Sequence, residues 1–115
     1  MAYVRLTVLR PTGGHRDEAL HALRDLDAAL ADHKGLIMSL VFHDAKSVGR
    51  LSVWETEAES NEAARDDRAM AFRSQIQGIP GDHIVELLAE ADTGMWSPGA
   101  LELLAGTLGW KQQRR

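Results

Sequence analysis

The chain has 115 residues, of which 44% are hydrophobic and 26% are charged, and its formal net charge is −4. This length and composition predict one globular domain and exclude disordered and low-complexity classes. Only 5% of the residues are aromatic, and the basic residues alternate with acidic ones, so no basic patch points to a nucleic-acid partner. Cysteine is absent, which excludes disulfides, thiolate nucleophiles and cysteine-based metal sites.

Two further patterns concern location. The segment Met1–Arg5 lacks the basic region and the apolar stretch with which a signal peptide begins. No apolar run approaches the roughly 18 residues that a membrane span needs. We therefore expect a cytoplasmic protein with no membrane partner.

The first predicted elements are a strand over residues 2–9 and a helix over residues 15–34. The strand follows from a period of two, with Val4, Leu6 and Val8 on one side and Tyr3, Arg5 and Thr7 on the other. In the helix, apolar residues recur at steps of three and four. Acidic residues lie in its first turn, where they favour the positive end of the helix dipole, and Gly35 follows as a left-handed cap.

A hairpin is expected next, with strands over residues 36–43 and 48–54 joined by a short polar turn. The first of these strands has an apolar row and a mixed row: Leu36, Met38, Leu40 and Phe42 against Ile37, Ser39, Val41 and His43. The second strand places Arg50, Ser52 and Trp54 in one row and Leu51 and Val53 in the other.

Thr56 and Glu59 fit a capping box that begins a second helix, predicted over residues 57–76. The charged residues 65–68 are expected to form a solvated face of that helix. A fourth strand is expected over residues 83–90. Residues 93–115 are predicted to be a C-terminal extension of the domain formed by residues 1–92, with a short leucine-rich helix over residues 99–110 near Trp96 and Trp110.

The order of the predicted elements is β-α-β-β-α-β, which indicates an α+β, ferredoxin-like fold with an antiparallel four-stranded sheet. Both helices then cover one face of the sheet, and the other face is left open. Candidates for the open face are Tyr3, Ile37, Val41 and Trp54. An apolar face of this kind predicts a homodimer. The alternative is a monomer in which the C-terminal tail covers the sheet.

This element order resembles the dimeric α+β barrel superfamily, as does the opening segment Ala2–Leu6. The segment Ser52–Glu59 at the junction of strand and helix is also similar. Within the superfamily, the antibiotic biosynthesis monooxygenase-like branch matches best, over about residues 2–92. The resemblance implies a dimeric barrel, and its members range from cofactor-free oxygenation of aromatic compounds to haem degradation.

The resemblance also identifies where this chain departs from some members. Haem-degrading members have an Asn on the first strand, and a Trp and a His in the second helix. This chain has none of these residues at the corresponding places. Many other members carry a His along the second helix, where this chain has Arg65, Arg68 and Arg73. Haem degradation of that kind is therefore not expected.

Candidate site residues lie mainly on the strands. His43 is a candidate base and Arg50 a candidate cation that stabilises a bound anion, so both are predicted as catalytic. The predicted ligand-binding residues are Tyr3, Arg5, Ser39, Trp54, His83 and Glu86. Each has a plainer interpretation: histidines at strand ends are often solvated, a strand arginine can form a salt bridge with Glu86, and the aromatic residues can pack in the core or the dimer interface.

No phosphate-binding loop, metal-ligand spacing or serine nucleophile motif is present in the sequence. We expect no metal and no cofactor. Two functions remain open. The first is a cofactor-independent, monooxygenase-like oxidoreductase that acts on a small aromatic or quinol-type molecule. The second is a non-catalytic ligand-binding or structural dimer with the same fold.

Overall fold

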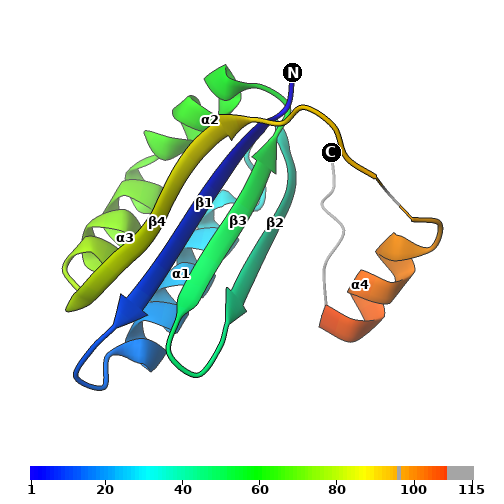
Figure 1. Cartoon of the computed structure of the whole chain (residues 1–115). Coiled ribbons are helices and arrows are strands. Elements are labelled where there is room, and N and C mark those ends of the chain that lie inside the picture. The colour runs from blue at the N-terminus through cyan, green and yellow to red at the C-terminus, as the bar shows by residue number, and fades with distance from the viewer. Residues whose placement is uncertain (96, 109–115) are drawn as a thin grey trace.

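The computed structural model describes residues 1–95 and 97–108. In chain order the elements are β1 (Tyr3–Pro11), α1 (Arg16–Leu30), β2 (Leu36–His43), β3 (Val48–Trp54), α2 (Glu57–Ala64), α3 (Asp67–Gln77), β4 (Gly81–Glu90) and α4 (Ala100–Leu108). The strands form one antiparallel sheet in the order β2-β3-β1-β4, with α1, α2 and α3 on one face (Figure 1). The predicted α+β, ferredoxin-like fold is confirmed.

Helix α1 supplies more residues to the apolar core beneath the sheet than any other element does. Its buried residues follow the predicted steps of three and four and include Leu23, Leu26 and Leu30. The helix ends at Leu30, four residues earlier than predicted. The ring of His33 instead contacts Asp66, with 2.9 Å between Nε2 and Oδ2. Gly35 has the predicted positive φ, +89°, but it belongs to the turn that leads into β2.

The single helix predicted over residues 57–76 is wrong: the structure has two helices, α2 and α3, separated at Arg65 and Asp66. The Asp66 side chain caps α3, since Oδ1 accepts hydrogen bonds from the backbone amides of Arg68 (2.9 Å) and Ala69 (3.2 Å). A capping aspartate favours extended backbone at its own position, so it ends one helix and begins another. Thr56 caps α2 as predicted, at 3.1 Å from the amide of Glu59.

The side of the sheet that faces the helices carries an unusual share of polar side chains. On β3 this row is Val48, Arg50, Ser52 and Trp54, all of them buried. On β1 the paired row is Tyr3, Arg5, Thr7 and Leu9. The assignment of Tyr3, Val41 and Trp54 to the open face is therefore wrong. Trp54 is only 1% exposed, and Val41, opposite Arg50, packs against the buried core.

Two bulges explain why the rows were difficult to assign. Between β2 and β3, Leu36 pairs with Trp54 while Met38 pairs with Val53, so Ile37 is an extra residue. Leu36 consequently faces the helices, and the continuous apolar row predicted from Leu36 to Phe42 is wrong at its first residue. Between β1 and β4, His83 pairs with Leu9 across a similar irregularity, because Ile84 is the extra residue.

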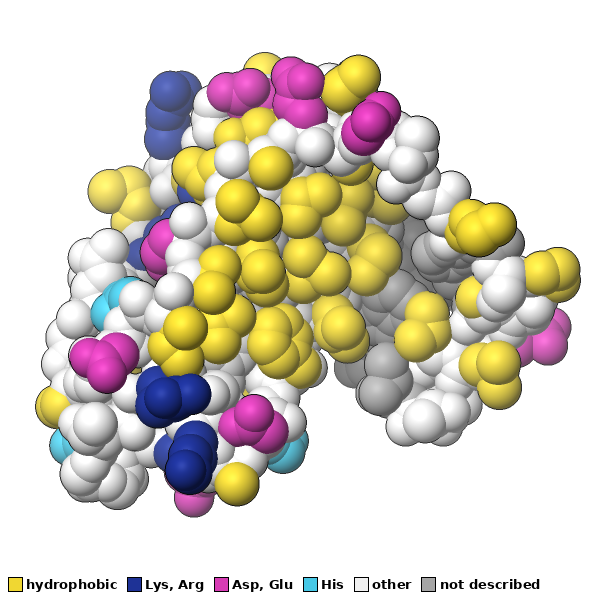
Figure 2. All heavy atoms as spheres, in the orientation of Figure 1, with side chains coloured by type: hydrophobic (Ala, Val, Ile, Leu, Met, Phe, Trp, Pro, Cys, Tyr) yellow, Lys and Arg dark blue, Asp and Glu magenta, His cyan; other side chains and the backbone are white. Residues whose placement is uncertain are grey.

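The opposite side of the sheet is apolar at every position that the strand pairing assigns to it. Figure 2 shows this surface as one continuous hydrophobic area over the sheet. We call it the open face. Its members, read from the pairing, are Val4, Leu6, Val8, Met38, Leu40, Phe42, Gly49, Leu51, Val53, Val85, Leu87 and Ala89. Gly49 lies under the ring of Phe42, and a side chain at this position would collide with that ring.

The C-terminal extension leaves the sheet after β4, and α4 stands apart from it (Figure 1). Within the described residues, α4 does not lie over the open face. Met95, in the segment between β4 and α4, is almost fully exposed. Helix α4 lies within the range predicted for it, although Trp96, Trp110 and the end of that range lie outside the described residues.

Candidate functional site

A pocket lies between the helix-facing side of the sheet and helices α1 and α3. Its cavity volume is about 60 Å³, or about 570 Å³ when the space open to solvent at its mouth is included. The exposed lining residues belong to α3 and β4, so the mouth lies between these two elements. The residues that line the pocket are Arg5, Leu6, Thr7, Leu23, Leu26, Arg50, Arg73, Ile76, Gln77, His83, Glu86 and Leu88.

Arg50 is the most deeply buried charged group of the pocket, at 5% exposure. Its Nε donates to Oδ1 of Asp27 on α1 at 2.9 Å. Its Nη2 is buried and has no hydrogen-bond partner. Burial lowers the pKa of Arg50, while the carboxylate of Asp27 acts in the opposite direction and Arg5 adds a smaller lowering effect. A guanidinium keeps its proton under these conditions, so Arg50 is a buried cation with one unused donor.

Arg73 on α3 is the second cation with an unused donor, since its Nε is buried without a partner. Burial, followed by the nearby charges of Arg5 and Arg50, lowers the pKa of Arg73, whereas Glu86 raises it. Arg5 is better satisfied, because its Nη1 donates to Oγ of the buried Ser60 at 3.0 Å. Three guanidinium groups thus line the pocket together with one carboxylate.

Arg73 was not among the predicted site residues, although the sequence contained a signal for it. It lies four residues after Ala69 and three before Ile76, both of which are buried. A helix presents residues at this spacing on one face, so Arg73 belongs to the buried stripe of α3. A charged residue at such a position indicates a buried polar site or an ion pair.

Glu86 and His83 lie at the mouth, on the exposed part of β4. Glu86 faces β1, where Oγ1 of Thr7 donates to its Oε2 at 3.3 Å. His83 faces the pocket because the bulge at Ile84 places it opposite Leu9. Carboxylate and imidazole side chains are common general bases in proteins, and one of each is present here.

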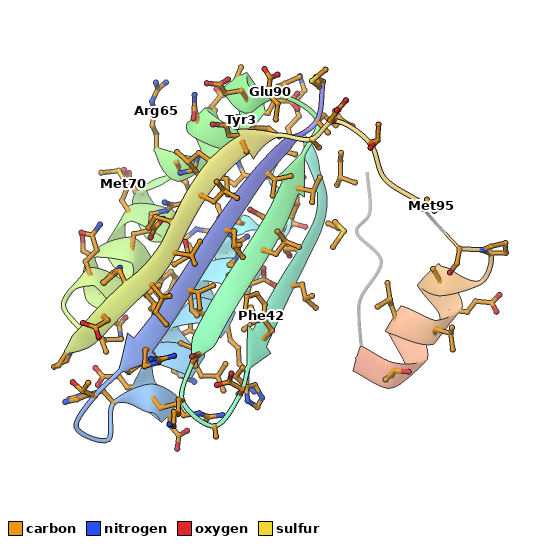
Figure 3. All side chains as sticks on the ribbon, viewed as in Figure 1. Tyr3, Phe42, Arg65, Met70, Glu90 and Met95 are labelled. Atoms are coloured by element: carbon orange, nitrogen blue, oxygen red, sulfur yellow. The ribbon has the colours of Figure 1, made fainter. Side chains whose placement is uncertain are left out.

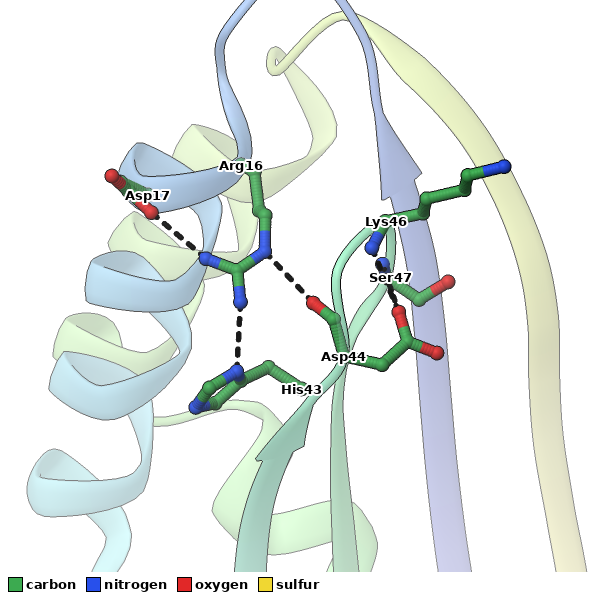
Figure 4. A network of polar contacts seen from close by, with 6 residues as sticks. All are labelled: Arg16, Asp17, His43, Asp44, Lys46 and Ser47. Carbon is green, nitrogen blue, oxygen red and sulfur yellow. Dashed lines mark hydrogen bonds and ion pairs between the residues drawn. The ribbon is translucent and has the colours of Figure 1, made fainter.

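His43 lies outside the pocket, at the far end of β2 (Figure 4). Its Nδ1 is 2.7 Å from Nη2 of Arg16, a group that only donates, so Nδ1 accepts and Nε2 carries the proton. Arg16 also donates to the backbone oxygen of Asp44 at 2.9 Å and to Asp17. These hydrogen bonds connect the β2–β3 turn to the start of α1.

Of the predicted residues, the structure brings together Arg5, Arg50, His83 and Glu86 in one pocket. Three others, in addition to His43, lie away from it. Tyr3 lies at the end of the sheet beside Glu90 (Figure 3). Trp54 donates from Nε1 to Oγ of Ser52 at 3.0 Å within the core. Ser39 lies on β2, where it pairs with Ser52 of β3.

In residues 1–95 and 97–108, no three side chains of the metal-binding types lie close enough together to share an ion. None of the helices there combines the length and the hydropathy needed to cross a membrane.

Comparison with known proteins gives the fold a context. Neither a protein-family model nor a curated protein sequence matches the chain. Among solved structures, SnoaB, a cofactor-independent oxygenase from Streptomyces nogalater, is similar with a TM-score of 0.65 at 11% identity, over 82% of this chain and 96% of that chain.

Two further structures are assigned as antibiotic biosynthesis monooxygenases. The one from Chloroflexus aurantiacus J-10-fl has a TM-score of 0.69 at 13% identity, over 84% of this chain and 98% of that chain. The one from Nitrosomonas europaea has a TM-score of 0.67 at 8% identity, over 78% and 89% of the two chains. The predicted resemblance is thus confirmed at the level of the fold: the chain has the fold of these antibiotic biosynthesis monooxygenase-like structures.

Proposed function

We propose that the protein is a cofactor-independent oxidoreductase of the monooxygenase type, with a small aromatic or dihydroquinone substrate bound at the pocket beneath the sheet. The observation that carries the proposal is the group of guanidinium, carboxylate and imidazole side chains gathered at a cavity whose lining also includes Leu23, Leu26 and Ile76. The fold shared with SnoaB, a cofactor-independent oxygenase, supports it. Fold alone does not determine function, so these side chains are what distinguishes the pocket as a candidate active site.

The chemistry needs two things from the protein. A base must take the proton of a ring hydroxyl, and a positive field must favour the resulting anion. Glu86 and His83 at the mouth serve as candidate bases, and Arg5, Arg50 and Arg73 supply the field. Inside a cavity with low dielectric, fixed cations stabilise an anion more strongly than they do in water.

The anion then gives one electron to O₂, and the superoxide and the ring radical combine to form a carbon–oxygen bond. The O–O bond of this hydroperoxide breaks as the ring carbon loses its hydrogen as a proton. In total, one dihydroquinone and one O₂ give one hydroxyquinone and one water. Spontaneous oxidation differs from this reaction, since it gives the quinone and hydrogen peroxide without a new carbon–oxygen bond.

The test is incubation of the full chain with a panel of dihydroquinones under ¹⁸O₂, without added metal or flavin. We expect one labelled oxygen atom in the product. Arg73→Ala should lower the rate of labelling about 100-fold, which is typical for removal of one group that stabilises a developing anion. Arg65→Ala is the matched control, since Arg65 is exposed and points away from the sheet (Figure 3). Unlabelled quinone and peroxide alone would count against the proposal.

A second candidate function is a non-catalytic ligand-binding module. The observation in its favour is the small cavity, about 60 Å³, because an engineered cavity that takes up benzene measures about 150 Å³. A complete ring therefore fits only with part of it in the mouth. Saturable binding of a ligand without any label in the product would support this function over the first.

We also propose that the open face is covered by a second copy of the chain. Four strands with seven to ten residues each give this face a footprint on the order of 500 Å². That is near the upper end of the apolar patches that monomers expose, and no charged side chain interrupts it. A two-fold axis would place the face against itself and bury it in both copies.

A further inference from the structure

Two side chains that line the pocket have a buried donor atom without a partner. Nη2 of Arg50 and Nε of Arg73 are both buried, and neither has a partner. They come from different elements, β3 and α3, and both side chains line the same cavity. Buried donors are nearly always satisfied in folded proteins, so two such donors at one cavity favour binding of an acceptor group there.

We infer that the acceptor is the carboxylate of the ligand, held at the bottom of the pocket by Arg50 and Arg73. This inference deepens the proposed function and rests on the same pocket. It adds a substrate class: small aromatic acids in which the ring carries both a carboxylate and the reactive hydroxyl groups. The carboxylate lies among the guanidinium groups, and the ring extends toward the mouth.

A carboxylate suits the two unpartnered nitrogen atoms. Its two oxygen atoms can accept from Nη2 of Arg50 and from Nε of Arg73, and guanidinium groups bind carboxylates with short, charge-assisted hydrogen bonds. A cavity of about 60 Å³ admits such a head group but not a complete ring. Leu88, which is 52% exposed, offers an apolar surface for the ring at the mouth.

The charges of the pocket agree with this assignment. Asp27 pairs with Nε of Arg50 and leaves its Nη2 free. Glu86 is held by Thr7 at the mouth, away from Arg50 at the base. The lining therefore keeps an excess of positive charge, and an anion relieves the repulsion between Arg5, Arg50 and Arg73. A neutral ligand would leave that repulsion in place.

The first experiment measures binding to the full chain by calorimetry, with benzoate, benzamide, acetate and inorganic phosphate as probes. We expect saturable binding of benzoate at millimolar concentration or below, and at least tenfold weaker binding of benzamide, which has the same shape without the charge. Equal affinities for benzoate and benzamide, or no binding of benzoate, would overturn the inference. Phosphate that binds as tightly as benzoate would also overturn it, since the site would then be a general anion site.

The matched variants are Arg73→Met and Arg65→Met. Arg73→Met should weaken benzoate at least tenfold, leave benzamide unchanged, and raise the thermal midpoint of the free protein, because it removes a buried donor without a partner. Arg65→Met should change none of these values. This design avoids the risk that a substitution of Arg50 leaves Asp27 unpaired and prevents folding. An unchanged benzoate affinity in Arg73→Met contradicts the inference.

A second experiment separates this inference from the proposed oxygenation. The substrates are 2,5-dihydroxybenzoate and its methyl ester, both of which are dihydroquinones. If the acid binds at least tenfold more tightly than the ester but neither is labelled from ¹⁸O₂, the carboxylate site stands and the oxygenase proposal fails. If both are labelled with equal KM, the oxygenase proposal stands and the carboxylate site fails.

Discussion

Gly35 shows how one residue controls the passage from α1 into β2. Its φ of +89° lies in the left-handed region, and a Cβ atom built there would collide with the side chain of Glu59. We expect Gly35→Ala to lower the free energy of unfolding by about 2–4 kcal/mol, because it adds backbone strain and a steric clash. Urea denaturation followed by circular dichroism measures this change.

Gly14 separates the two contributions. It also has a positive φ, +81°, but a Cβ atom there would meet nothing within 4 Å. Gly14→Ala should therefore cost about 1–2 kcal/mol, the backbone contribution alone. Equal losses in the two variants would show that the contact with Glu59 is unimportant.

Asp66 is a residue whose charge affects stability at acid pH. Its hydrogen bond with His33, and then its bond with the Ala69 amide, hold the pKa of Asp66 below the ordinary value of 3.8. Since the folded state binds this proton more weakly than the unfolded state, the carboxylate stabilises the fold above pH 3.8, and this stabilisation is lost as the pH falls through the lowered pKa.

Asp66→Asn tests this prediction, because asparagine is an equally good N-cap residue without a charge. We expect the thermal midpoint of the variant to fall less steeply than that of the wild type when the pH is lowered below about 4. The remaining slope should come partly from Asp44, whose pKa is lowered by the Lys46 and Ser47 amides. Parallel profiles for variant and wild type would refute this role of Asp66.

At the scale of the elements, the sequence predicts well wherever a regular period continues without interruption. The bounds of β2 and β3 and the cap at Thr56 are as predicted, since alternation and a capping box are local signals. The break between α2 and α3 was missed because a capping aspartate also fits the exposed face of one longer helix. The bulges at Ile37 and Ile84 are not predicted, because an extra isoleucine in a strand cannot be distinguished by residue type from one that pairs regularly.

The site was predicted only in part, for the same reason. Arg5, Arg50, His83 and Glu86 share the pocket because strand pairing places them on one side of the sheet. The sequence does not show which row of each strand faces the helices, because in three strands both rows carry large apolar groups. Arg73 comes from a helix whose break was missed, so its approach to Arg50 depends on packing that the sequence pattern does not contain.

For the whole molecule, the proposed dimer makes a clear prediction for single substitutions. Leu87 on the open face is 46% exposed, and Met70 on α3 is 52% exposed. Leu87→Lys should place a charge in the proposed interface and shift sedimentation toward the monomer. Met70→Lys, matched in exposure but on the far side of the helices, should leave the dimer intact. A dimer that survives both substitutions would mean that the open face is not the interface.

The polar row beneath the sheet makes the stability of the fold depend on protein concentration. On the helix-facing side of the sheet, polar residues occupy positions that apolar residues usually fill: Arg5, Thr7, Arg50 and Ser52. Much of the apolar surface that the strands can bury therefore lies on the open face, against the proposed second copy. Each tenfold increase in protein concentration should then add about 1.4 kcal/mol of resistance to denaturant per mole of dimer. A urea midpoint that stays constant from nanomolar to micromolar protein concentration would mean that the monomer is stably folded without a partner.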